Sequence, residues 1–176
     1  MTKQKYDIVI AGGGIVGCAA ALALAKHTDY SIAVIEAFSQ GKQAKASESQ
    51  HITPANSDNS GDQVHPSFDT RVVALAQESY QQLLAFGIDM NAVVTCPIRH
   101  IHVSDRGHLG QVQLKAHNGL GSSSIKDSSM GYVVSLAEMG AQLLTQIESS
   151  RIDYLSPFKI TQIQREQDST TVSLLN

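Results

Sequence analysis

The sequence is short of cysteine, of charge and of long apolar runs, and each shortage excludes a class of protein. Its two cysteines, Cys18 and Cys96, lie far apart and form no Cys-x-x-Cys pair, so we expect small buried thiols in a reducing compartment and no disulfide framework. Charged residues make up only 16% of the chain, the formal net charge is -3 and there is no basic stripe, which argues against nucleic acid as a partner.

The apolar run at 15–25 is shorter than the roughly 20 residues of a membrane span. It also contains Gly17 and lacks a cleavage site, so we expect no transmembrane segment, no signal peptide and a cytoplasmic location.

The first 36 positions carry a pattern that is typical of one βαβ unit. A short β-branched run at 6–11 (YDIVIA) suits a buried parallel strand, and a second apolar run follows at 31–36 (SIAVIE). Between them, at 14–27, apolar residues recur at the three- and four-residue spacing of a helix. Strand, helix and strand within about 30 residues predict a parallel sheet. With 176 residues, 42% of them hydrophobic, the chain is expected to form one α/β domain.

Two polar stretches, at about 39–67 and 119–129, are expected to be exposed loops between the other elements. After the first loop we expect a helix at 71–86, capped by Asp69 or Thr70 and ended by Gly87. The buried face predicted for this helix comprises Val72, Leu75, Ala76, Leu83 and Phe86.

The second half of the chain predicts mostly strands. A hairpin is expected from strands at 99–104 and 111–115, with a turn through Asp105, Arg106 and Gly107. A strand at 132–135 and a helix at 136–148 follow the second polar loop. The last predicted strands lie at 152–155, at 159–165 and in the stretch TTVSLLN.

The glycines of the stretch AGGGIVG (11–17) have the spacing of a dinucleotide-binding turn. Gly12, Gly14 and Gly17 form Gly-x-Gly-x-x-Gly directly after a predicted strand and at the start of a predicted helix. The first glycine permits a tight turn, the second lets a pyrophosphate approach the backbone, and the third lets helix and strand pack closely. The helix N-terminus then offers N–H groups and a positive dipole end to the phosphates.

Glu36 stands at the end of the second predicted strand, nineteen positions after Gly17. An acid at this place accepts hydrogen bonds from a ribose hydroxyl and repels a 2′-phosphate, which disfavours NADP in this pocket. The alternative interpretation is a tight turn without a ligand and a surface glutamate. These residues by themselves do not separate FAD from NAD.

Arg71 is expected in the first turn of its helix, where a cation opposes the helix dipole. A bound anion such as a cofactor phosphate would resolve that conflict. A salt bridge to Asp69, or a solvated side chain, is the alternative interpretation.

Other candidate sites have ordinary explanations. His100 and His102 share a strand face, but no cysteine or carboxylate lies near them at ligand spacing, so we expect no metal site. The absence of a Gly-x-Ser-x-Gly motif argues against a serine hydrolase. Tyr80 and Phe86 are expected on the packed face of their helix.

Four segments in order, DIVIAGGGIVGCAAALALA, VIEA, FDTRVVALAQES and IHVSDRGHLGQVQL, resemble the N-terminal part of the FAD-dependent aromatic hydroxylases of ubiquinone biosynthesis, which are class A monooxygenases. VSDRGHLG at 103–110 is most similar to the 2-polyprenyl-6-methoxyphenol hydroxylase branch. The resemblance implies an α/β, Rossmann-like FAD-binding domain with a parallel central sheet and an added β-hairpin or meander, incomplete at the C-terminus.

The resemblance also implies roles for individual residues. Gly12, Gly14 and Gly17 would hold the FAD pyrophosphate, Glu36 the adenosine ribose, and Arg71 would lie near the tightly bound flavin cofactor. In such enzymes NAD(P)H reduces the flavin and molecular oxygen supplies the hydroxyl group added to a phenol ring. We nominate no catalytic residue, because the cofactor carries the chemistry.

Partners and location follow from the same resemblance. It implies a polyprenyl phenol as substrate, a ubiquinone-biosynthesis enzyme complex as partner, and a cytoplasmic protein peripheral to the inner membrane. Two alternatives from other classes are an NAD-dependent dehydrogenase and a non-catalytic dinucleotide-binding module.

The sequence departs from the family pattern in several places. The downstream Asp-Gly and Gly-Asp flavin motifs and most of the substrate region are absent, and Gln142 stands where the family helix usually carries an arginine. We therefore interpret residues 1–176 as the N-terminal part of an FAD-binding monooxygenase domain.

We expect the chain of 176 residues to be inactive as a hydroxylase by itself, because the family's flavin-ring segments are not in it. The measurement is turnover of a phenol with NADPH and oxygen. Hydroxylation by this chain alone would contradict the expectation.

Overall fold

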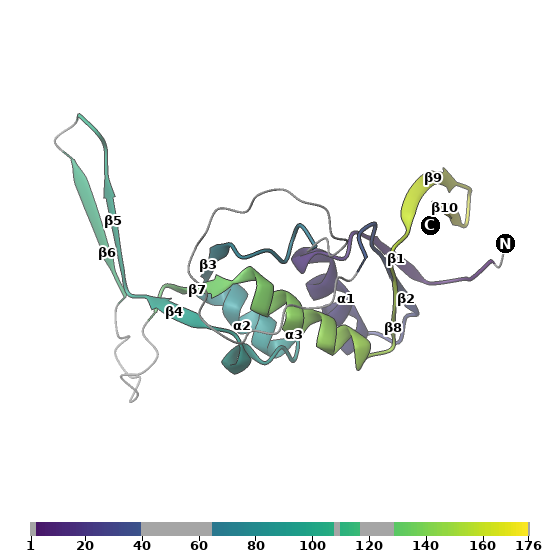
Figure 1. Cartoon of the computed structure of the whole chain (residues 1–176), viewed down its shortest axis with the longest axis horizontal. Coiled ribbons are helices and arrows are strands. Elements are labelled where there is room, and N and C mark those ends of the chain that lie inside the picture. The colour runs from purple at the N-terminus through teal and green to yellow at the C-terminus, as the bar shows by residue number, and fades with distance from the viewer. Residues whose placement is uncertain (1–2, 40–64, 108–109, 117–128, 176) are drawn as a thin grey trace, which may run out of the picture.

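The computed structural model describes residues 3–39, 65–107, 110–116 and 129–175. The described part is elongated: three helices lie at its middle, one hairpin extends from one end, and a second hairpin lies beside the N-terminus at the other (Figure 1). The expected polar loops at 39–67 and 119–129 fall mostly outside these ranges.

A three-stranded parallel sheet combines two strands from the start of the chain with one from near its end. Strand β2 (Ile32–Ile35) lies in the middle, between β1 (Ile8–Ala11) and β8 (Ile152–Leu155), and pairs with both in parallel. All four residues of β2 are buried, as expected for the central strand of a covered parallel sheet. The α/β class and the parallel sheet predicted from the sequence are confirmed.

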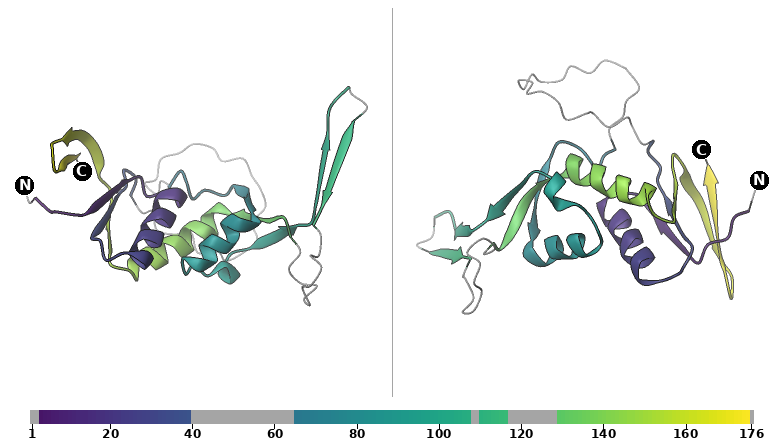
Figure 2. Two further views of the ribbon diagram at one scale, coloured as in Figure 1. Left: turned by 180° about the vertical axis from the view of Figure 1, so that it is seen from behind. Right: turned by 90° about the horizontal axis from the view of Figure 1, so that it is seen from below.

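Two helices cover this sheet and contact one another (Figure 2). Helix α1 (Ile15–His27) is apolar over most of its length, and Lys26 in its last turn carries a positive charge that suits the C-terminal end of the helix dipole. Helix α3 (Leu136–Glu148) begins at Ser135, whose hydroxyl accepts a hydrogen bond from the Glu138 N–H. The buried residues of α3 are Leu136, Met139, Gly140, Leu143 and Ile147.

A second sheet is antiparallel and joins segments that are far apart in the sequence. Strand β7 (Gly131–Ser135) lies between β3 (Val72–Ala76) and β4 (Thr95–Ile98). Helix α2 (Gln77–Ala85) follows β3 directly, and a short 3-10 helix, η1 (Met90–Ala92), leads into β4.

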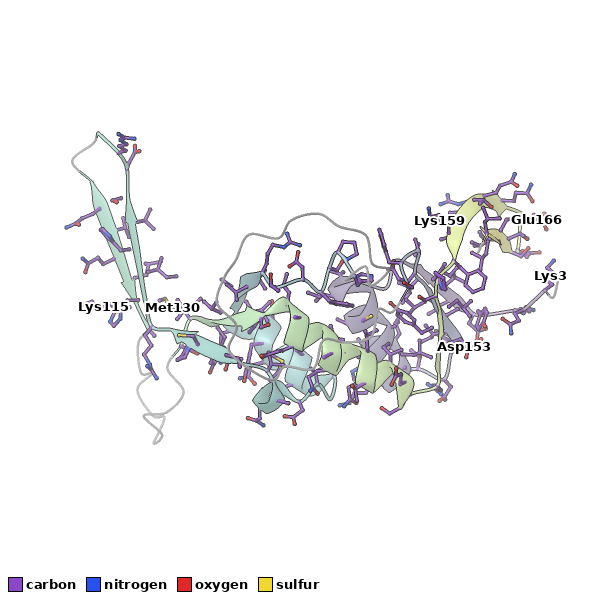
Figure 3. The ribbon with its side chains drawn as sticks, in the orientation of Figure 1. Lys3, Lys115, Met130, Asp153, Lys159 and Glu166 are labelled. Atoms are coloured by element: carbon purple, nitrogen blue, oxygen red, sulfur yellow. The ribbon has the colours of Figure 1, made fainter. Side chains whose placement is uncertain are left out.

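Two hairpins extend from these sheets. Strands β5 (His100–Ser104) and β6 (Gln111–Lys115) are exposed at every residue, and their side chains project into solvent (Figure 3). Lys115 and Met130 mark the place where this hairpin leaves the second sheet (Figure 3). Strands β9 (Lys159–Arg165) and β10 (Thr170–Leu175) form the other hairpin.

The prediction of a helix at 71–86 is wrong for the first part of that range. Residues 72–76 form strand β3, and the N-cap of the helix is Ala76 in place of Asp69 or Thr70. Short apolar runs fit both helix and strand patterns, and here pairing with β7, about 60 positions away, selects the strand. Val72 is consequently 63% exposed and not part of a buried helix face. Gly87, with a φ of +94°, ends the helix as predicted.

Two further points correct the sequence-based expectations. Strand β4 was not predicted, because Pro97 and its neighbours give little local signal. Cys96, on that strand, is exposed, whereas Cys18 is buried as expected. Among the described helices, none is long and apolar enough to cross a membrane.

Replacing Leu143 by alanine is expected to lower the free energy of unfolding by about 2–5 kcal/mol, because its fully buried side chain would leave a cavity. The matched control is Leu175→Ala at a side chain that is 61% exposed, with an expected change within about 0.5 kcal/mol. Urea unfolding followed by circular dichroism measures both, and equal losses would contradict the described core.

Candidate functional site

The glycine turn lies between β1 and α1 and has the geometry of a dinucleotide-binding turn. Gly12 has a φ of +103°, which side chains rarely adopt, and its N–H donates to the Ile35 carbonyl of β2 at 2.8 Å. A Cβ on Gly17 would overlap the Gly12 carbonyl oxygen, so a side chain there would push the helix away from the turn. Gly14 is the N-cap of α1 and provides no side chain to its first amides.

Glu36 is bound to this turn. It is the one buried charged residue found in the part of the chain that the structure describes, with 5% of its surface exposed. Its Oε2 accepts a hydrogen bond from the Gly13 N–H at 2.7 Å, and its Oε1 accepts one from the Phe38 N–H at 2.9 Å. Burial alone would raise the pKa of this carboxyl, but the Phe38 N–H, the His65 ring and the Gly13 N–H together hold its pKa below the ordinary value. The carboxylate is therefore fixed in its charged form beside the helix N-terminus.

His65 faces the same carboxylate from a different part of the chain. Its Nε2 lies 3.1 Å from Glu36 Oε2, and its side chain is 10% exposed. Its Nδ1 accepts a hydrogen bond from the Ser67 N–H at 3.1 Å, so a ring proton lies on Nε2, toward Glu36. The ring stacks on Phe68 at 4.6 Å and meets Phe38 edge-on at 5.8 Å. Sequence reasoning missed this residue, because nothing local connects position 65 with Glu36.

Tyr154 and Cys18 both donate hydrogen bonds to the backbone of the glycine turn. The Tyr154 hydroxyl donates to the Gly13 carbonyl at 3.3 Å, and the Cys18 thiol donates to the same oxygen at 3.1 Å. Burial, and then the charge of Glu36, raises the pKa of the Cys18 thiol to about 12, so it stays protonated. The pKa of Tyr154 is also raised, chiefly by burial. Both groups act as donors that position the Gly13 peptide.

Arg71 is not in a helix, so the helix-dipole argument made for it from the sequence does not hold. Its Nε donates to both carboxylate oxygens of Asp69, at 2.8 and 2.6 Å, and its Nη2 donates to the Pro66 carbonyl at 3.2 Å. The salt bridge to Asp69, the alternative interpretation, is therefore the observed contact. Through Pro66, Arg71 contacts the segment that carries His65.

The structure brings together the glycines 12, 14 and 17 and Glu36 at one point, the carboxyl end of β1 and β2. His102 lies elsewhere, on the exposed hairpin, with its Nε2 3.1 Å from the Gln111 side chain. Within 3–39, 65–107, 110–116 and 129–175, no group of three or more side chains is placed to hold a metal ion.

The residues of the turn fit the ADP half of a dinucleotide. The positive φ of Gly12 and the close approach of Gly17 build a turn that a side chain would block, and the amides at the start of α1 suit phosphate. A carboxylate has about four lone-pair positions, and the Gly13 and Phe38 N–H groups use two of those on Glu36. The remaining positions suit ribose hydroxyl groups.

Glu36→Gln is expected to lower the free energy of unfolding by about 1–3 kcal/mol at pH 7, since a charged acceptor of two buried N–H groups is lost. The pKa of Glu36 is lowered by folding, so its contribution is fully present above the ordinary value of about 4.3 and is lost as the pH falls through the lower folded value. Urea unfolding is measured between pH 7 and pH 3. The difference in free energy of unfolding between the parent and Glu36→Gln should shrink below about pH 4.3. The control is Glu148→Gln at an exposed glutamate, and a gap that stays constant with pH would contradict this assignment.

Comparison with known proteins places this geometry in a family. Residues 7–152 match the family described as FAD dependent oxidoreductase, which covers more than half of the chain. Over 44 residues the chain is 45% identical to hydrogen cyanide synthase subunit HcnC of Pseudomonas protegens, a match that covers 25% of this chain and 11% of that protein.

Solved structures share the fold at low sequence identity. Those of p-nitrophenol 4-monooxygenase PnpA from Pseudomonas putida and of pqsL, a probable FAD-dependent monooxygenase from Pseudomonas aeruginosa, superpose with TM-scores of 0.59 and 0.60 at 18% and 15% identity. OxyS anhydrotetracycline hydroxylase from Streptomyces rimosus gives 0.61 at 16% identity. They match 95%, 96% and 97% of this chain, which spans 35%, 38% and 28% of theirs.

The parallel sheet, the glycine turn and the family match agree with one another. The chain belongs to the FAD dependent oxidoreductase family.

Proposed function

We propose that this chain provides the ADP-binding part of the FAD site in a monooxygenase that hydroxylates a polyprenyl phenol in ubiquinone biosynthesis. The observation that carries the proposal is the buried Glu36 carboxylate, held against the glycine turn by the Gly13 N–H at 2.7 Å. A carboxylate and the N-terminus of α1 are the two groups that the ribose and pyrophosphate of FAD require.

Each residue of the site then has a separate task. The backbone around Gly12 and Gly14 would approach the pyrophosphate, and Gly17 would keep α1 close enough for its first amides to do so. Glu36 would accept hydrogen bonds from the adenosine ribose and exclude a 2′-phosphate. Arg71 would lie near the flavin. When bound, FAD would supply electron transfer from NAD(P)H and the activation of oxygen.

The aromatic hydroxylase branch is supported by segments outside the βαβ unit. FDTRVVALAQES covers β3 and the start of α2, and VSDRGHLG begins on β5. The four segments follow one another in the order found in the ubiquinone hydroxylases. This resemblance is also the basis for proposing a polyprenyl phenol substrate, a biosynthetic enzyme complex as partner, and a cytoplasmic position peripheral to the inner membrane.

Equilibrium dialysis of the purified chain against FAD, NAD and NADP tests the cofactor. We expect saturable binding that favours FAD, and at least about tenfold weaker binding by Gly14→Val, which corresponds to about 1.4 kcal/mol. A Cβ on Gly14 would lie 2.8 Å from Ser67 Oγ, and the larger valine would also cover the helix N-terminus.

The matched control is Gly110→Val, because a Cβ at Gly110 has no described atom within 4 Å. This variant should bind FAD as the parent chain does. Preferential binding of NAD would contradict the flavin proposal and favour the dehydrogenase alternative.

A further inference from the structure

The segment 65–68 lies over both halves of the proposed nucleotide site. His65 Nε2 is 3.1 Å from Glu36 Oε2, at the carboxylate proposed to hold ribose. Ser67 packs on Gly14, since a Cβ built there would lie 2.8 Å from Ser67 Oγ and 3.2 Å from Ser67 Cβ. The same short segment therefore contacts the acid and the N-cap of the helix.

The contacts of His65 resemble those that a ribose would make. With a proton on Nε2 the ring presents an N–H to Glu36, as a ribose hydroxyl would present an O–H. The Nε2 atom is buried and lies 3.1 Å from Glu36 Oε2, but it makes no well-formed hydrogen bond to any of the described residues. Buried polar groups in proteins are nearly always hydrogen-bonded, so a ribose hydroxyl aligned with this oxygen could replace the His65 contact.

The two ends of the segment are held by different kinds of contact. Phe68 is 7% exposed, and its ring fills the space above Gly140, where a Cβ would overlap it. His65 and Ser67 are held by the hydrogen bond between them, by the ring stack and by the Arg71 guanidinium on the Pro66 carbonyl. Phe68 is thus the firmly packed end of the segment, and its N–H donates to the His65 carbonyl at 2.9 Å.

From this juxtaposition we propose that residues 65–67 are an internal competitor for the dinucleotide, covering Glu36 and Gly14 in the nucleotide-free chain and leaving them when an ADP moiety binds. The proposal rests on the proposed function, because it needs the nucleotide site to be the glycine turn. When a site is open for only a fraction of the time, its apparent dissociation constant equals the intrinsic dissociation constant of the open site divided by that fraction. If the segment covers the site about nine-tenths of the time, its removal tightens binding about tenfold.

Calorimetric titration with ADP and with FAD tests the proposal on three forms of the chain: the parent, His65→Ala and His65→Phe. The alanine variant loses the ring and its contact with Glu36. The phenylalanine variant keeps an aromatic ring between Phe38 and Phe68 but has no nitrogen, so it serves if the alanine variant fails to fold. We expect both to bind ADP about tenfold more tightly than the parent. His102→Ala, on the exposed hairpin, is the matched control and should leave affinity unchanged.

A second readout separates competition from a purely structural role. Urea unfolding without nucleotide should show His65→Ala to be less stable than the parent, although it binds ADP more tightly. If His65 only supported the fold, its replacement would lower both the stability and the affinity for ADP. In nuclear magnetic resonance spectra of the parent, the imidazole signal that is missing from His65→Ala should move toward that of an exposed histidine when ADP saturates the site.

The outcomes distinguish this proposal from the proposed function. If the parent binds ADP and FAD but the His65 variants bind equally or more weakly, the competitor role is wrong and the nucleotide site stands. If neither the parent nor any variant binds ADP or FAD, the nucleotide site at the glycine turn is wrong, and the competitor role is overturned with it.

Discussion

The buried carboxylate of Glu36 is the constraint on which the rest of the site depends. A charge that is only 5% exposed persists when hydrogen bonds replace its water, and here the Gly13 and Phe38 N–H groups do so. The first of these bonds joins the end of β2 to the turn after β1, so the acid also fixes the glycine backbone. Charge, turn and helix N-terminus are one unit, and a change to any one of them alters the other two.

Residues that act through local pattern were predictable from the sequence. The glycine spacing, the apolar runs on either side and the acid after the second run predicted β1, α1, β2 and the position of Glu36, because a βαβ unit is built from neighbours in the chain. Helix α3 was predicted over its full length, at 136–148.

What could not be predicted depends on partners far away in the sequence. Val72 and Val73 fit a helix or a strand, and only the presence of β7 decides between them. His65 gave no signal in a polar stretch, because its significance comes from Glu36 and from the rings of Phe38 and Phe68. The salt bridge of Arg71 was foreseen as an alternative, whereas its contact with the Pro66 carbonyl was not.

The hydrogen bond from Tyr154 to the Gly13 carbonyl spans 141 positions and has a consequence for synthesis in the cell. The βαβ unit leaves the ribosome early, but β8 and its tyrosine follow only after more than a hundred further residues have been added. At ordinary translation speeds this interval is on the order of ten seconds. Throughout it the glycine turn lacks the hydrogen bond from Tyr154 and β2 lacks one of its two neighbours, so the turn is complete only once β8 has been added.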